Sequence, residues 1–93
     1  KNHIIFYYHR PVMISIKHGE TIYFLDDDIE TNKKTLNFFQ FLTHKKINPV
    51  KEIKTKRING EKALFSPLID LFLDFGFKKD IQYLSYRYGY SDF

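Results

Sequence analysis

The first 25 residues alternate short apolar runs with turn-forming residues. β-Branched and aromatic side chains, which favour strands, fill residues 4–8, 11–17 and 21–25. Turn-prone pairs separate these runs at His9-Arg10 and His18-Gly19. Because links this short join antiparallel neighbours, the pattern predicts a three-stranded antiparallel meander.

The middle run has a period of two residues. The aliphatic residues Val12, Ile14 and Ile16 alternate with Met13, Ser15 and Lys17. Successive side chains of a strand point to opposite faces of a sheet. We therefore expect the three aliphatic residues on the buried face and the other three on the more exposed face.

The residues that follow the acidic break at 26–28 have a helical pattern. Thr31 or Asn32 is suited to cap a helix that runs to about His44. The apolar side chains of this segment share one broad face, and they are Leu36, Phe38, Phe39, Phe41 and Leu42. The sequence therefore predicts one helix that packs this face against the sheet.

A second helix is predicted after Ser66-Pro67, because serine is a favoured N-cap and proline is favoured at the first helical position. It ends at Gly76, since glycine is a common helix stop. On a helical wheel, Asp70 and Asp74 are the only polar residues between 68 and 75. This apolar helix either packs inside the domain, which we favour, or contacts another domain or subunit.

Two later segments have strand patterns. Residues 50–58 alternate well enough for a fourth strand, closed by the turn Asn59-Gly60. Residues 81–88 predict a last strand with Tyr83 on one face and, on the other, Leu84, Tyr86 and Tyr88. The element order is β-β-β-α-β-α-β. We expect one α+β domain over residues 1–93, a largely antiparallel sheet with two helices packed on it.

Composition narrows the class of protein. The chain has 93 residues, of which 43% are hydrophobic and 18% aromatic, enough for one small core. The absence of cysteine excludes disulfides, cysteine zinc sites and thiol chemistry. No apolar run approaches the roughly 18 residues of a membrane helix, and no signal peptide opens the chain. We therefore expect a cytoplasmic protein without a membrane partner.

Motifs for catalysis, metals and nucleotides are missing from the sequence. The pattern G-x-x-x-x-G-K-[ST] does not occur, and the four glycines are too scattered for G-x-G-x-x-G. The four histidines lack metal-ligand spacing. The carboxylates at 26–28 fit a solvated turn, and those of Asp70 and Asp74 fit the solvated stripe of a helix. We expect no catalytic residue, metal or cofactor in this chain.

The positive charge is concentrated in one segment. Residues 44–57 hold six basic residues against the single acid Glu52, a local charge of +5 in a chain of net charge +4. These basic residues are Lys45, Lys46, Lys51, Lys54, Lys56 and Arg57. Such a patch can follow the phosphates of a nucleic acid. The alternative is a solvated sheet edge whose lysines prevent pairing with another edge.

An aromatic run near the end of the chain surrounds a further cation, Arg87. The aromatic rings of this run could stack on unpaired bases. The run consists of Tyr83, Tyr86, Tyr88 and Tyr90. The alternative is a final strand whose tyrosines are half-buried with their hydroxyls in water. We include Arg87 with the six cations of residues 44–57 as candidate nucleic-acid contacts.

Most of the chain, over residues 4–88, resembles the extreme C-terminal domain of large helicase-related (Lhr-type) ATP-dependent helicases, and the most specific part is residues 57–77. The resemblance rests on four short motifs, which are Arg57-Ile58-Asn59-Gly60-Glu61, Ala63-Leu64, Ser66-Pro67-Leu68 and Phe75-Gly76-Phe77. In that family a hydrophobic-Asp/Asn-Gly-Glu turn, a Ser-Pro-Leu helix start and a closing Gly-Phe precede the last strand. The chain departs from the family pattern at Lys62 and Phe65, where the family has proline and a small residue.

The resemblance implies that this chain is the C-terminal part of a longer superfamily 2 helicase, which binds ATP upstream and acts in DNA repair. It implies no catalytic residue here. We expect a non-catalytic accessory domain that binds nucleic acid, with single-stranded DNA favoured, or contacts the rest of the parent chain. The alternatives are an oligomerisation or protein-interaction module that uses the apolar second helix, and a free-standing binding protein.

Overall fold

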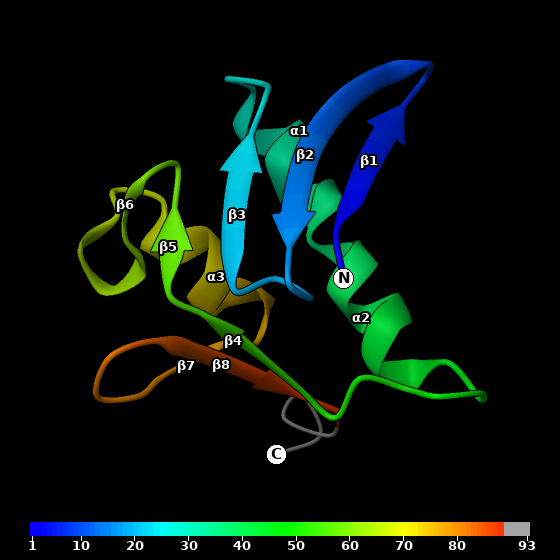
Figure 1. Cartoon of the computed structure of the whole chain (residues 1–93). Helices are drawn as coiled ribbons and strands as arrows, with labels where there is room; N and C mark the ends of the chain where they lie inside the picture. Colours follow the sequence, from blue (N-terminus) through cyan, green and yellow to red (C-terminus); the bar gives the residue numbers. More distant parts are fainter. Residues whose placement is uncertain (89–93) are drawn as a thin grey trace.

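The computed structural model describes residues 1–88 and has an α+β fold with two sheets (Figure 1). The larger sheet has the strand order β1-β2-β3-β5-β6, and the smaller has the order β4-β8-β7. The elements in chain order are β1 (His3–Tyr7), β2 (Arg10–Ile16), β3 (Thr21–Phe24), α1 (Ile29–Thr35), α2 (Asn37–His44), β4 (Glu52–Thr55), β5 (Arg57–Ile58), β6 (Glu61–Lys62), the 3₁₀ turn η1 (Ala63–Phe65), α3 (Ile69–Phe75), β7 (Lys78–Lys79) and β8 (Leu84–Arg87).

The predicted antiparallel meander of β1, β2 and β3 is confirmed. The first turn is centred on Tyr8 and His9, and the second on Lys17 and His18, each pair with positive φ. Two consecutive positive φ angles are typical of the tight turns that match the right-handed twist of paired strands. Both turns therefore begin one residue earlier than the sequence predicted.

The predicted faces of β2 are reversed for most residues. Met13 and Ser15 are fully buried, whereas Ile14 and Ile16 are only partly buried. In Figure 1, α1 and α3 lie behind the larger sheet, and Met13 belongs to the same buried cluster as Leu71 and Phe72 of α3. Val12 is buried too, because the β-bulge opposite Ile5 and Phe6 changes the register beside it. A period of two identifies two faces, but it does not say which one the helices cover.

The predicted first helix begins earlier and is divided in two. Asp28, which follows β3, is the N-cap of α1, and its Oδ2 accepts hydrogen bonds from the backbone N (3.0 Å) and Oγ1 (2.7 Å) of Thr31. These hydrogen bonds lower the pKa of Asp28 because they stabilise the carboxylate. Leu36 separates α1 from α2. The prediction of a cap at Thr31 or Asn32 was wrong, since both lie inside α1.

The predicted fourth strand is split between the two sheets. β4 pairs with β8, whereas β5 pairs in parallel with β3 and antiparallel with β6. The break is at Lys56, where the backbone N atoms of Lys56 and Arg57 both donate to the carbonyl of Glu20 (2.8 and 3.2 Å). Asn59 and Gly60 form the β5–β6 turn with positive φ, and Asn59 Oδ1 accepts a hydrogen bond from Phe24 N (2.8 Å). The basic segment therefore changes sheet halfway along.

The end of α3 is where the sequence predicted it, whereas the start of α3 and the last strand differ from the prediction. Gly76 ends the helix with φ of 129°, as predicted. Ser66 Oγ accepts a hydrogen bond from Leu68 N (3.1 Å), so it caps the turn that leads into α3 rather than the helix itself. β8 is shorter than the predicted strand, and β7, which pairs with it, was not predicted. Tyr90 lies outside the described residues.

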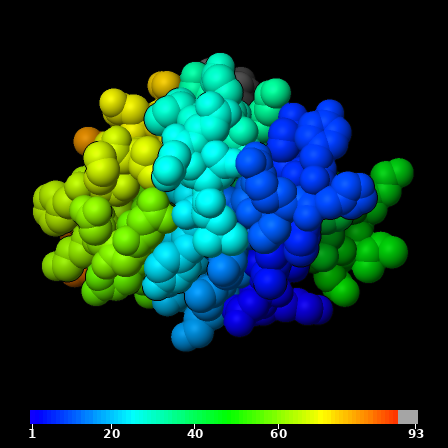
Figure 2. Space-filling model, turned by 90° about the horizontal axis from the view of Figure 1, so that it is seen from above, coloured from blue at the N-terminus to red at the C-terminus, as the bar shows by residue number. Residues whose placement is uncertain are grey.

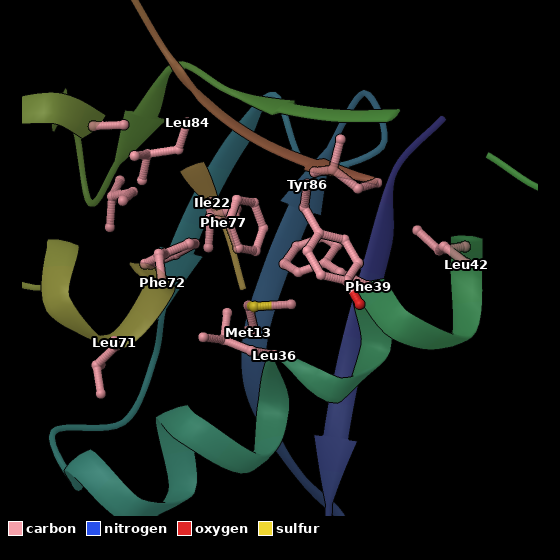
Figure 3. Packing of buried hydrophobic residues seen from close by; sticks show 13 residues of the cluster. Met13, Ile22, Leu36, Phe39, Leu42, Leu71, Phe72, Phe77, Leu84 and Tyr86 are labelled. Atoms are coloured by element: carbon pink, nitrogen blue, oxygen red, sulfur yellow. The ribbon is translucent and has the colours of Figure 1, made fainter. Parts of the chain in front are cut away.

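One aromatic core joins the helices to both sheets. Figure 3 shows the buried rings gathered between the helices and the strands, and they are those of Phe39, Phe72, Phe77 and Tyr86. The rings of Phe72 and Phe77 are 5.1 Å apart between centroids, in an edge-to-face arrangement. Every apolar residue of α3 is buried or half-buried against this core. The expectation that α3 packs inside the domain is therefore confirmed.

A candidate nucleic-acid interface

The basic segment does not form one stripe on the folded chain. Its first three lysines lie at the end of α2 and in the loop that follows, and they are Lys45, Lys46 and Lys51. Lys54 lies on β4, and Lys56 and Arg57 lie at the break between β4 and β5. Arg87 lies at the end of β8, opposite Glu52. The structure thus distributes the candidate cations over three places.

The first place is a cleft of about 400 Å³ between the β5–β6 hairpin and the loop that leads into β8. We call it the hairpin cleft, and its lining includes Lys56, Arg57, Lys62, Phe65, Ile81 and Gln82. Arg57 and Lys62 are directly opposite each other in the β5–β6 pair, so their side chains share one face. The cleft therefore combines three cations, from the β4–β5 break, β5 and β6, with three apolar side chains, which are Leu64, Phe65 and Ile81.

Two apolar side chains of the hairpin cleft are largely exposed. Phe65 has 77% of its surface exposed and Ile81 has 87%. No other aromatic ring of residues 1–88 stacks on Phe65, in contrast to the rings of the core. Single exposed rings are common on protein surfaces, but Phe65 and Ile81 line one cleft together, and grouped exposed apolar side chains often mark binding sites. Most of the Phe65 side chain is thus accessible to a planar ligand.

The cations of the hairpin cleft are weakly engaged within the chain. Arg57 Nη1 is at the hydrogen-bond limit from the carbonyl of Gly60, at 3.5 Å. Lys56 Nζ is 3.9 Å from Glu20 Oε1, and both side chains are well exposed. Exposed ion pairs of this length contribute little stability. These cations can therefore exchange their partners for phosphates.

The second place is an open hollow at the end of α2. Its lining includes His44, Lys45, Lys51 and Tyr88. The rings of His44 and Tyr88 are 4.1 Å apart between centroids, so each covers part of the other. Tyr88 is largely exposed, as its predicted role in base stacking requires, although one side of its ring already contacts His44.

The third place is the outward face of β4 and β8, where the charges are paired. Arg87 Nη2 is 3.5 Å from Glu52 Oε1, and Ser85 Oγ donates to Glu52 Oε2 at 2.6 Å. Lys54 Nζ lies 5.5 Å from the centroid of the Tyr83 ring. Arg87 is therefore neutralised by the one acid of the basic segment, and Tyr83 is already covered by a cation.

Tyr83 and Tyr86 were also predicted to stack on bases, and both contact other residues of the chain instead. Tyr86 is 3% exposed and packs on Phe75 and Phe77 at centroid distances of 5.1 and 5.2 Å, so it cannot stack on a base. Tyr83 is half-buried, and a hydrogen bond with Asp80 raises its pKa. The predicted run of stacking tyrosines is thus reduced to Tyr88 among residues 83–88.

Sequence reasoning missed most of the hairpin cleft. Lys62, Phe65 and Ile81 lie outside the basic segment, and the fold brings them beside Lys56 and Arg57. The Asn59-Gly60 pair was a usable signal, because a two-residue turn of this type places the residues before and after it in register. No comparable signal indicated Ile81.

The remaining ionisable groups of residues 1–88 include no metal-holding cluster. No group of three or more histidine, aspartate or glutamate side chains in that range is placed to hold a metal ion, and none of its helices is long and apolar enough to cross a membrane. His3 and His18 have ring centroids 5.9 Å apart. The pKa values of both imidazoles are lowered, mainly because the rings are partly buried and also because the positive charge of Lys1 is nearby.

No protein-family model, curated protein or solved structure matches this chain. The resemblance to the C-terminal domain of Lhr-type helicases therefore stays a prediction that rests on the quoted motifs.

Proposed function

We propose that this chain is a non-catalytic domain that binds single-stranded nucleic acid in the hairpin cleft, with single-stranded DNA favoured over duplex. The observation that carries the proposal is the exposed ring of Phe65 beside Lys56, Arg57 and Lys62. Cations that line a groove bind the phosphate backbone, and open aromatic faces stack on bases. Unpaired bases expose the faces that this arrangement needs, whereas a duplex hides them.

The fold gives the cleft a fixed shape. Arg57 and Lys62 are on a hairpin whose turn is tied to β3 through Asn59, and Ala63 N donates to the carbonyl of Lys56 at 2.9 Å. Side chains on short, anchored strands need little reordering when they bind a ligand. The candidate cations Lys45 and Lys51 line the separate hollow at the end of α2, and in this proposal they contribute only long-range electrostatic attraction.

From the resemblance we further propose that the parent protein is a cytoplasmic Lhr-type, ATP-dependent helicase that acts in DNA repair. A helicase that holds its strand transiently gains processivity from a second tethered contact, because tethering raises the effective concentration of the domain near the strand. Such a contact needs no chemistry in this chain. The alternative of oligomerisation through α3 has little support, because its apolar side chains pack into the core.

The test is fluorescence anisotropy of a labelled 12-residue oligothymidine at two salt concentrations. The wild type should bind at low salt, and about three neutralised phosphates should give a slope near −2 for log affinity against log salt. Phe65→Ala should weaken binding roughly five-fold or more, because one stacked base contributes about 1–3 kcal/mol. Lys62→Glu should weaken binding and make the salt slope shallower by about 0.7 per lost phosphate contact.

Two matched variants control for charge and for aromatic content. Lys33→Glu changes the net charge as Lys62→Glu does but lies on α1, and Phe41→Ala removes a ring that is 61% exposed on α2. Both should bind like the wild type. The proposal is wrong if the wild type does not bind at low salt, or if Lys62→Glu and Lys33→Glu weaken binding equally.

A further inference from the structure

The outer face of the larger sheet carries two neighbouring rows of side chains. The register of β1, β2 and β3 places Ile4, Ile14 and Tyr23 in one cross-strand row. The next row is continued by β5 and β6, and its members are Ile16, Thr21, Arg57 and Lys62. Directly paired residues point to the same side of a sheet. An aliphatic and aromatic row therefore lies beside a row that ends in two cations.

This face is open along both rows. Ile4 is 58% exposed and Tyr23 is 39% exposed, while Arg57 and Lys62 are also exposed. In Figure 1, α1 and α3 lie behind the sheet, and no described element lies in front of β2 and β3. Figure 2 shows from above that the green β5–β6 segment, the cyan β3 and the blue first strands lie side by side. Together they form one continuous side of the molecule.

The rows and the hairpin cleft share residues. Arg57 and Lys62 belong to the second row and also line the cleft that contains Phe65. Neither row contains an acidic side chain. Residues two apart on a strand are separated by about 7 Å, so the Tyr23 row lies about that far from the Arg57 row. The outer face therefore begins where the cleft ends. The cations Arg57 and Lys62 lie next to the cleft, and the ring of Tyr23 lies beyond them.

We propose that a single-stranded nucleic acid leaves the hairpin cleft past Arg57 and continues across the outer face of the larger sheet, where the next base stacks on Tyr23. This inference rests on the function proposed above and extends it from one cleft to a longer site. The charge of the face decides the occupant, because a polyanion with planar groups matches cations beside an exposed ring. The aliphatic side chains of Ile14 and Ile4 provide the apolar surface beyond Tyr23.

The experiment compares a labelled single thymidine nucleotide with phosphates at both ends and a labelled 12-residue oligothymidine by fluorescence anisotropy at low salt. The nucleotide has one base and occupies only the cleft, whereas the oligonucleotide also reaches Tyr23. Tyr23→Ala should weaken binding of the oligonucleotide about five-fold or more and leave binding of the nucleotide unchanged. Tyr23→Phe should bind both like the wild type because it keeps the ring. Phe65→Ala should weaken both, and Phe41→Ala, on α2, should weaken neither.

A second measurement on the unaltered protein does not depend on how variants fold. Ultraviolet cross-linking to a long oligonucleotide that carries 5-iododeoxyuridine should yield a cross-linked peptide with Tyr23. The inference is overturned if Phe65→Ala weakens binding while Tyr23→Ala does not and Tyr23 is never cross-linked, and the cleft alone then remains. Failure of the wild type to bind the 12-residue oligothymidine overturns the proposed function as well. A dimer in sedimentation that Tyr23→Ala converts to a monomer overturns the inference in favour of a second copy.

Discussion

The two faces of the larger sheet are built from the same strands, but the inner face is buried and the outer face is exposed. On the inner face Met13, Ser15 and Ile22 have no exposed surface, and Phe72 of α3 packs into the same cluster as Met13 and Ile22. On the outer face the paired residues Ile14 and Tyr23 remain partly or largely exposed. Hydrophobicity does not separate the faces, because both are rich in apolar residues. The helices separate them, since they cover one side only.

The inner face therefore serves stability, and in this proposal the outer face serves binding. Burial of large apolar side chains provides most of the driving force for folding. The outer face contributes little of that burial, so its composition is free to serve a ligand. Substitutions on the inner face should therefore unfold the protein, whereas substitutions on the outer face should change binding and leave stability nearly unchanged.

The largest effect is expected for Phe72→Ala. Phe72 is fully buried, with its ring 5.9 Å from that of Phe24 and 5.1 Å from that of Phe77 between centroids. Its truncation should lower the free energy of unfolding by about 3–5 kcal/mol, which is a large part of the stability of a small domain. Urea denaturation followed by circular dichroism measures this change. The exposed Phe41→Ala is the matched control, and an equal loss in both variants would contradict the comparison of faces.

Gly19→Ala should have the next largest effect. Gly19 has φ of +89°, and a Cβ there would be 2.7 Å from Ile53 Cγ2 and 2.8 Å from Phe39 Cε1. Backbone strain and overpacking together should lower the free energy of unfolding by about 2–4 kcal/mol.

Gly60→Ala separates these two causes. Gly60 has a similar φ of +86°, but no atom lies within 4 Å of an added Cβ. Only backbone strain remains, so the expected loss is about 1 kcal/mol. Urea denaturation of both variants measures the difference. Equal losses would mean that the inner face tolerates an added methyl group beside Phe39, which a close-packed core does not.

The sequence predicted the features that depend on neighbouring residues. The meander followed from short apolar runs with tight turns, and the stop at Gly76 followed from the ability of glycine to adopt positive φ. The predicted cap at Thr31 or Asn32 failed because Asp28, three residues before Thr31, bonds its backbone N. The buried side of β2 could not be read from β2 itself, since it depends on where the helices pack.

The candidate site was predictable only in part, for a similar reason. The cluster of charge at residues 44–57 was visible, but the break at Lys56 depends on the distant carbonyl of Glu20. That break moves Arg57 onto the larger sheet, opposite Lys62. The pairing of Arg87 with Glu52 likewise depends on the register of β4 and β8. Long-range pairing therefore decides which cations remain available to a ligand.

The smallest effect is expected from the titration of His3 and His18 at the edge of the inner face. His3 is paired with Ser15, and its ring also contacts Phe38 at a centroid distance of 4.9 Å. Burial and neighbouring positive charge lower the pKa of both imidazoles below the ordinary value of 6.5, so the folded state favours their neutral forms. The unfolded chain therefore binds protons first as the pH falls.

The stability provided by the neutral imidazoles is complete above about pH 6.5 and decreases as the pH falls through the lowered pKa values. The melting temperature should consequently be lower at pH 5.5 than at pH 7.5, a range in which ordinary carboxyl groups stay ionised. The double substitution of His3→Gln and His18→Gln should make the melting temperature less dependent on pH. Thermal unfolding followed by circular dichroism measures both proteins. The same pH dependence in both proteins would place the responsible groups elsewhere and contradict the prediction.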